Sequence, residues 1–355
     1  KNINNIDVIV LTLFFSFLLR CRQFFILNSS YDFLKLNVSS NILLMSVLYM
    51  PTGLYFIFRF LPLTETHSDF LNIILILGFM LILVFSILLM QAHNLKKLII
   101  FMGSCQFGIL LLTVGIKAYN ATIFYFFTCT ISLVIFGLGF GTIMFKLNNE
   151  EDIRHMGSLI IKTPSIFLFI LISFISLLGA PYFSGFYSNK LLLESFFRSD
   201  VEYHIIAFTA CFLYTFIISY VLFKVIIIVF LGRNNCDIHL YDKINDARIK
   251  IKSILLILST ILVFSGWYLN NLFYGNNAEN LWRLVILGNS DFSLNNKFNQ
   301  HEWALTFRYY ICFLGLFLAI FNYAIIPKLV KNLRLKNNKL FKYYLKSLTS
   351  YDFNK

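Results

Sequence analysis

Three ionisable side chains within or beside long apolar runs have the chemistry needed to carry protons. Lys224, in SYVLFKVIIIVF, lies several residues from either end of its run. Lys190 and Glu194 follow another run and are four residues apart, so a helix would place them on one face. A charge at the centre of a membrane helix costs at least ~2.5–3.5 kcal/mol, which makes such residues candidates for function. Lys224 could instead snorkel to the membrane surface or pair with a carboxylate for structure.

Arginines near the ends of apolar runs have a simpler explanation, because a long side chain can place its charge at the membrane surface. Arg20 and Arg22 lie near the end of the first run, and Arg59 closes the second. Arg308 falls in the first turns of the last run. We therefore expect Arg59 and Arg308 at the interface.

An interrupted helix is predicted next to Lys190 and Glu194. Residues 179–194 read GAPYFSGFYSNKLLLE, in which Pro181 removes a backbone donor and Gly185 lacks a Cβ. Pro51 interrupts another apolar run. Broken helix at membrane depth is tolerated where protein or water surrounds it. The alternative is a helix that simply ends at Pro181, with both charged residues in an aqueous loop.

The composition places these residues in a membrane protein. Hydrophobic residues make up 58% of the 355 and charged ones only 13%, about half the charged fraction of soluble domains. Apolar runs long enough for a ~30 Å hydrocarbon core recur along the chain. We predict an all-α, polytopic helix bundle with about nine spanning helices, some broken: 8–27, 42–61, 70–90, 98–116, 121–145, 159–182, 205–231, 253–273 and 303–327.

Nine spans divide the loops into two sets that differ in charge. Residues 28–41, 91–97, 146–158, 232–252 and the tail from 328 hold 18 Lys and Arg, whereas the opposite set holds 6. Basic loops face the cytoplasm or matrix, so this asymmetry predicts the orientation. It also explains the net charge of +13 without nucleic acid. We divide the chain into a bundle (1–327) and a basic amphipathic tail (328–355).

Motifs for soluble enzyme chemistry are missing from the sequence. The six cysteines form no CxxC pair and no cluster with histidine at metal-ligand spacing, so we expect no metal. There is no phosphate-binding loop, dinucleotide fingerprint or nucleophile elbow. We therefore predict no cofactor on this chain.

Three blocks together resemble the antiporter-like subunit 5 of mitochondrial NADH dehydrogenase, respiratory complex I. They read NLKKLIIFMGSCQFG (94–108), LNNEEDIRHMGSL (147–159) and GAPYFSGFYSNKLLLE (179–194), and they occur in the family's order and spacing. The second is the most specific, and the similarity extends over about residues 20–335. Phe, Ile, Asn and Lys, whose codons are AT-rich, are abundant, which is typical of an organelle gene.

The resemblance implies a multi-pass subunit of the complex I membrane arm in the mitochondrial inner membrane, with its basic loops and tail in the matrix. It implies part of an antiporter-like proton-translocating module, coupled to NADH oxidation by ubiquinone, without a redox centre of its own. The expected partners are lipid and other membrane-arm subunits. The family's first helices and its long lateral helix have no counterpart here. We therefore expect a central fragment or a split-gene product, completed by another chain.

Several residues depart from the family's proton relay. Arg20 takes the place of a lysine and keeps the charge, but it does not release protons. Other relay positions of the family fall on Met45, Cys129, Leu133 and Asn189. The proton-path candidates that remain are Lys190, Glu194, Lys224 and Arg20.

Two alternatives stay open beside the proton-translocating subunit. With so much of the relay replaced, the chain could be a largely structural remnant that holds partner subunits without conducting protons. It could also belong to a stand-alone, multi-subunit cation/proton antiporter that shares the fold. The organelle-like composition and the missing helices argue against independent transport.

Overall fold

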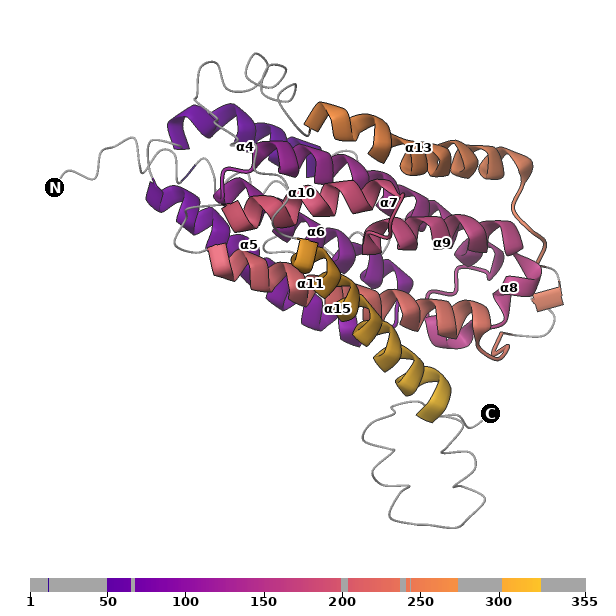
Figure 1. Cartoon of the computed structure of the whole chain (residues 1–355). Coiled ribbons are helices and arrows are strands. Elements are labelled where there is room, and N and C mark those ends of the chain that lie inside the picture. The colour runs from indigo at the N-terminus through magenta and orange to yellow at the C-terminus, as the bar shows by residue number, and fades with distance from the viewer. Residues whose placement is uncertain are drawn as a thin grey trace, which may run out of the picture.

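The computed structural model describes residues 50–64, 68–198, 204–236, 241–242, 244–273 and 302–326, together with residue 12. Within these ranges the chain forms helices and no strand, and the helices run alongside one another as a bundle (Figure 1). The predicted all-α fold is confirmed. The helices are α4 (Met50–Thr64), α5 (Ser68–Gln91), α6 (Leu95–Gly115), α7 (Tyr119–Lys146), η2 (Ile153–His155), α8 (Leu159–Lys162), α9 (Pro164–Leu178), α10 (Ser184–Arg198), α11 (His204–Val225), η3 (Ile226–Leu231), α13 (Ile249–Phe273), α15 (Glu302–Ile320) and η5 (Phe321–Ile325).

Six helices of the described part are long and apolar enough to cross a membrane, and each coincides with a predicted span. They cover Leu71–Gln91, Leu95–Gly115, Tyr119–Lys146, Ile205–Leu231, Ile249–Asn270 and Ala304–Ile325. Agreement is close because backbone groups in lipid must be hydrogen-bonded within the segment, which ties helix length to the length of the apolar run.

The sixth predicted span, 159–182, is wrong as a single helix. The chain forms a short turn of helix in α8, restarts at Pro164 as α9 and ends that helix at Leu178. Proline suits the first turn of a helix because the missing N–H has no partner there. The segment predicted as loop 183–204 is helical in α10 up to Arg198. One crossing is therefore shared by two helices.

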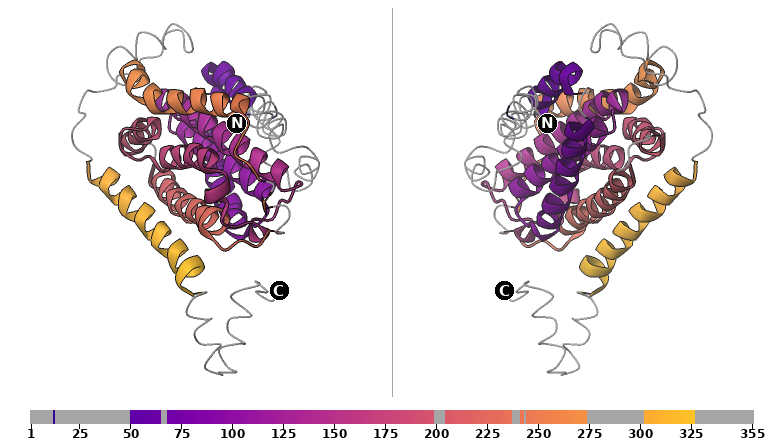
Figure 2. Two further views of the ribbon diagram at one scale, coloured as in Figure 1. Left: turned by 90° about the vertical axis from the view of Figure 1, so that its right-hand side faces the viewer. Right: turned by 90° about the vertical axis from the view of Figure 1, so that its left-hand side faces the viewer.

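The centre and the outside of the bundle differ in burial. In α6, 94% of the most apolar window is buried, compared with 22% in α13 and in α15. Both views of Figure 2 place α13 and α15 on the outside. Their exposed side chains are large and apolar, including Phe264, Trp267, Phe313 and Phe317. Such surfaces suit lipid or a partner subunit, not water.

The centre is tightly packed where α5 meets α6. A Cβ added to Gly78 would stand 2.8 Å from the carbonyl oxygen of Gly108, and one added to Gly108 would stand 2.8 Å from Cγ1 of Ile82. The two backbones thus approach as closely as glycine allows. Small residues at such contacts are typical of packed membrane helices.

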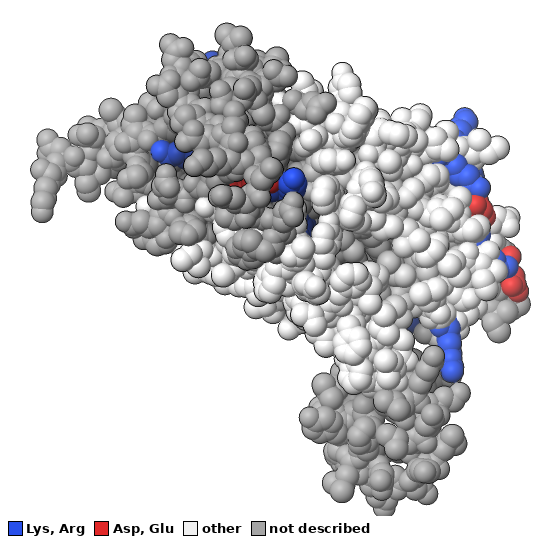
Figure 3. Space-filling view, viewed as in Figure 1, with Lys and Arg blue, Asp and Glu red and all other residues white. Residues whose placement is uncertain are grey.

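Three of the predicted basic loops meet at one end of the bundle. The backbone N–H of Ile153 donates to the carbonyl of His93 at 3.0 Å, and Nδ2 of Asn235 donates to the carbonyl of Arg154 at 3.0 Å. Lys146 donates to the carbonyl of Asn245. In Figure 3 charged side chains gather at this right-hand end, beyond a broad uncharged surface. The loops therefore share one side, as the parity of the spans predicts.

Some predictions lie outside the described residues. These are the first span, the start of the second, Arg20, Arg22, Met45 and the tail 328–355. Pro51 lies in the first turn of α4, and the residues that would show an interruption before it are among those not described.

Candidate functional site

The helix interruption lies between α9 and α10. Gly179 follows Leu178 with φ +77°, a left-handed conformation that favours glycine. Its N–H donates to the carbonyl of Ser176 at 2.9 Å, and the N–H of Ala180 donates to that of Ile175 at 3.1 Å. Pro181 lies in the turn that follows, before α10 begins at Ser184.

Gly185 was predicted to lie in the interruption and instead occupies the first turn of α10. A Cβ there would stand 1.8 Å from the carbonyl oxygen of Ser176 in α9. The glycine is therefore needed for a close approach between two helix ends and not for flexibility.

Hydroxyl groups gather around the interruption. Oγ of Ser176 and Oγ of Ser184 are 3.4 Å apart, and Oγ of Ser188 lies 3.0 Å from Oγ1 of Thr128 in α7. Asn189, the next residue, is 4% exposed. Neutral polar groups of this kind hydrogen-bond across membrane helices at modest energy.

Lys190 and Glu194 form an i,i+4 ion pair on α10, with 3.9 Å between Nζ and Oε1. Their side chains are 36% and 15% exposed. At this exposure an ion pair contributes about 0–1 kcal/mol, so the pair by itself adds little to stability.

Lys224 is fully buried near the end of α11, at 0% exposure. Its Nζ donates to the carbonyl oxygen of Met90 at 3.0 Å and to that of Ala92 at 2.9 Å, and it lies 5.9 Å from the ring centroid of Tyr323. The ammonium thus binds the C-terminal end of α5, where the helix dipole favours a cation. Backbone carbonyls, and not the carboxylate we considered from sequence, hold it.

Two π-helical segments border Lys224. η3 begins at Ile226, and η5 contains Tyr323, whose hydroxyl accepts a hydrogen bond from Tyr220 at 3.3 Å. Single π turns in α-helices often mark functional sites. Here they bring the lysine and the two tyrosines together between α11 and α15.

Ionisable groups in lipid are costly, so the sequence predicts that Lys190 or Glu194 lies near Lys224. The contacts of the described residues instead place them at different levels of the bundle. Asn189 on α10 and Arg308 on α15 both lie beside Gly179, so they are at the same height in the bundle. Arg308 is also close enough to Cys211 on α11 to act on it electrostatically. Lys224 is 13 residues beyond Cys211 on the same helix, and at 1.5 Å per residue this is about 20 Å. The cause is that α10 continues the crossing begun by α9 and does not fold back beside it.

The loop block 147–159 docks on the residues that follow α5. An isolated antiparallel bridge joins Asn94 to Asp152, and Nδ2 of Asn94 donates to Oε2 of Glu151 at 2.6 Å. Glu151 also forms an ion pair of 2.6 Å with Lys96. Two of the three blocks that carry the resemblance, 94–108 and 147–159, thus fold into one unit adjacent to Lys224.

Outside the membrane-spanning helices, His93 has its pKa lowered to about 4. Partial burial is the main cause, followed by the charges of Lys224 and Arg154, against which Asp152 acts. A folded-state pKa below the ordinary value of 6.5 means that protonation favours unfolding. The free energy of unfolding is therefore not reduced by His93 above pH 6.5, and it decreases as the pH falls from 6.5 toward 4.

We expect the melting temperature of the solubilised protein to fall between pH 6.5 and 4, and His93→Gln to flatten this slope. The measurement is a thermal melt at half-unit pH steps. The control is His155→Gln, because His155 lies in the loop between α7 and α8 and its side chain is 64% exposed. If His93→Gln and the parent protein show the same slope, His93 is not the cause of the pH dependence.

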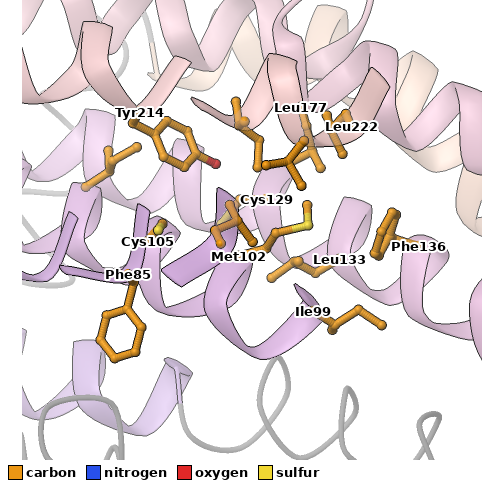
Figure 4. Close-up of a cluster of buried hydrophobic side chains, with 14 of the residues drawn as sticks. Phe85, Ile99, Met102, Cys105, Cys129, Leu133, Phe136, Leu177, Tyr214 and Leu222 are labelled. Atoms are coloured by element: carbon orange, nitrogen blue, oxygen red, sulfur yellow. The ribbon is translucent and has the colours of Figure 1, made fainter. Parts of the chain in front are cut away.

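The relay positions on α7 lie in an apolar cluster. Cys129 is 2% and Leu133 is 3% exposed. Figure 4 shows both among Met102, Phe136 and Leu177, at the meeting of α6, α7, α9 and α11. Neither side chain can carry a proton near neutral pH. The apolar side chains around them do not favour a proton there either.

Two buried polar features were missed by the sequence analysis. Arg308, expected at the interface, is only 4% exposed and faces the interruption. Gln106 is 0% exposed and lies within reach of the hydroxyl of Tyr214. Periodicity could not locate either, because their helices are apolar on all sides. In the described ranges no three His, Cys, Asp or Glu residues are arranged to hold a metal ion.

These features define an integral membrane protein with an interrupted spanning helix and buried cations on neighbouring helices. Residues 1–213 match the family described as "NADH:quinone oxidoreductase/Mrp antiporter, TM". This chain belongs to that family.

Curated relatives of the chain are named NADH-ubiquinone oxidoreductase chain 5. The protein of Acanthamoeba castellanii is 25% identical over 96% of this chain and 50% of its own length. That of Chondrus crispus is 27% identical over 66% of this chain and 36% of its own length, and that of Pongo abelii is 33% identical over 43% and 25%. The chain therefore spans half or less of the length of these relatives.

Solved structures show the same fold. A chain of the Mrp complex from Dietzia sp. DQ12-45-1b aligns with a TM-score of 0.60 at 17% identity, covering 71% of this chain and 55% of that one. A chain of the membrane-bound sulfane sulfur reductase, an archaeal respiratory membrane complex, aligns with a TM-score of 0.58 at 16% identity, covering 71% and 52%. At these identities the likeness concerns the fold alone.

Proposed function

We propose that this chain is a membrane-arm subunit of respiratory complex I in the mitochondrial inner membrane. It contributes part of an antiporter-like proton-translocating module coupled to NADH oxidation by ubiquinone. The observation that carries this is the similarity to the Acanthamoeba chain 5 along 96% of the chain. Redox chemistry takes place on other subunits.

The ionisable groups serve different halves of the membrane in this proposal. Lys224 exchanges protons at the end where the basic loops meet, since it lies beside the turn after α5. Lys190 and Glu194 act at the other end, on the same helix as Ser188, whose hydroxyl lies beside that of Thr128. Arg20 remains a candidate on sequence grounds. The apolar cluster around Cys129 separates the halves, so transfer across it depends on rearrangement or on a partner.

The outer helices offer apolar surfaces for partner subunits and lipid. α13 and α15 expose aromatic and aliphatic side chains along their length, such as Trp267 at 70% and Phe313 at 66%. We assign these faces to other membrane-arm subunits and to acyl chains.

Native electrophoresis of solubilised mitochondrial membranes tests the proposal. Peptides of this chain should peak in the band with in-gel NADH dehydrogenase activity. Proton pumping per NADH is then measured in vesicles that carry variants of Lys224 and Lys190. Migration in a separate complex without NADH activity would indicate a stand-alone antiporter. Co-migration with unchanged pumping in fully assembled variants would indicate a structural subunit.

The orientation can be checked with single cysteines on opposite loops. Arg233 is exposed after η3, on the side of the basic loops, and Lys117 is exposed in the turn between α6 and α7. We expect a membrane-impermeant maleimide to label Arg233→Cys only from the matrix side, and Lys117→Cys only in intact mitoplasts. Labelling of Arg233→Cys in mitoplasts, with an intact-membrane control, would reverse the assignment.

A further inference from the structure

Arg308 is a buried cation on a largely exposed helix, where Ala304 and Ala319 are also buried. Its side chain is 4% exposed, whereas its neighbours on α15, Phe307 and Tyr310, are 49% and 68% exposed. The helix is therefore rotated so that the guanidinium enters the bundle and does not snorkel. Burying it there demands compensation, because an uncompensated charge in a membrane bundle is costly.

Its surroundings are the interruption between α9 and α10. Nη2 of Arg308 lies 3.5 Å from the point where a Cβ on Gly179 would stand, and Nδ2 of Asn189 lies 2.6 Å from the same point. Tyr309, which follows Arg308 on α15, donates a hydrogen bond from its hydroxyl to the carbonyl of Gly179 at 3.3 Å. Two consecutive residues of α15 thus engage the end of α9.

Within the ranges that the structure describes, no carboxylate pairs with Arg308, and its Nε has no hydrogen-bond partner. The guanidinium lies beside the C-terminal end of α9, which carries the equivalent of about −0.5 charge. The helix dipole therefore favours a guanidinium at the end of α9. This partial negative charge can stabilise no more than one cation. The neutral amide of Asn189 adds no second charge.

We propose that the interruption is a site for a single buried cation, and that Arg308 on α15 occupies it. Because arginine stays protonated, it is a fixed charge and not a proton carrier. The guanidinium positions the end of α9 and excludes a second cation at this level, including a mobile metal cation. This role does not depend on the complex to which the chain belongs.

Relocating the charge tests the proposal. Asn189→Lys adds a second cation beside Arg308 and should lower the amount of folded protein in the membrane at least threefold. Arg308→Gln removes the fixed charge and should do the same. The double variant restores a single cation on the neighbouring helix and should recover at least half of the parent amount. The readouts are the quantity and the melting temperature of the intact protein in detergent, neither of which requires activity.

Two controls separate charge from size. Asn189→Met has nearly the length of lysine without the charge, so adding Arg308→Gln should not rescue it. Arg308→Lys keeps the charge and should remain closer to the parent than Arg308→Gln. The proposal is overturned if Asn189→Lys alone is as abundant as the parent, or if the methionine and lysine doubles recover equally.

Discussion

Replacing Lys224 by methionine is expected to lower the stability of the assembled protein by about 3 kcal/mol. The ammonium donates to the carbonyls of Met90 and Ala92 in a fully buried position. Methionine has a similar length and no donor, so both bonds from a charged group are lost, at roughly 1.5–3 kcal/mol each. The end of α5 would lose these hydrogen bonds to α11. Native electrophoresis and thermal melts of the solubilised complex measure the effect.

The matched control is Lys190→Met, the same change at a lysine that is 36% exposed. A partly exposed ion pair contributes about 0–1 kcal/mol, so assembly should be nearly unchanged. If Lys224→Met assembles normally but pumps fewer protons per NADH, Lys224 is a carrier and not a structural link. If Lys224→Met both assembles and pumps normally, Lys224 is neither a proton carrier nor a structural link.

Gly185→Ala is expected to cost about 3 kcal/mol or more. The added Cβ would stand 1.8 Å from the carbonyl oxygen of Ser176 and 2.8 Å from its carbonyl carbon. Both are backbone atoms of α9, so relief requires α10 to move as a whole. Overpacking that forces backbone shifts typically costs 1–3 kcal/mol, and this contact is more severe than most. The melting temperature of the solubilised protein reports the loss.

Gly103→Ala in α6 provides the comparison. A Cβ there meets only side chains, Cε of Met50 at 3.5 Å and Cδ1 of Leu133 at 3.9 Å. These are ordinary contacts, and alanine favours helix over glycine by about 0.5–1 kcal/mol. We therefore expect an unchanged or higher melting temperature. Equal behaviour of the two alanine variants would show that the α9–α10 contact is not tight.

The membrane-spanning helices could be predicted from the sequence because their cause is local. Lipid offers no hydrogen bonds, so an apolar run of sufficient length becomes a helix whatever its neighbours are. This explains why the span predicted at 205–231 reappears as Ile205–Leu231. The division of the loops between the two ends of the bundle could also be predicted, because it depends only on whether an odd or even number of spans separates them.

The environment of each polar side chain was decided by the tertiary structure. Arg308 and Lys224 both lie in apolar runs, and nothing in those runs reveals that one faces the end of α9 and the other the end of α5. Gly185 likewise owes its importance to the Ser176 carbonyl in the preceding helix and not to its own conformation. Such contacts depend on how each helix is rotated about its axis and on which helix it meets. In an all-apolar helix the sequence does not specify that rotation, because no face is marked by polarity.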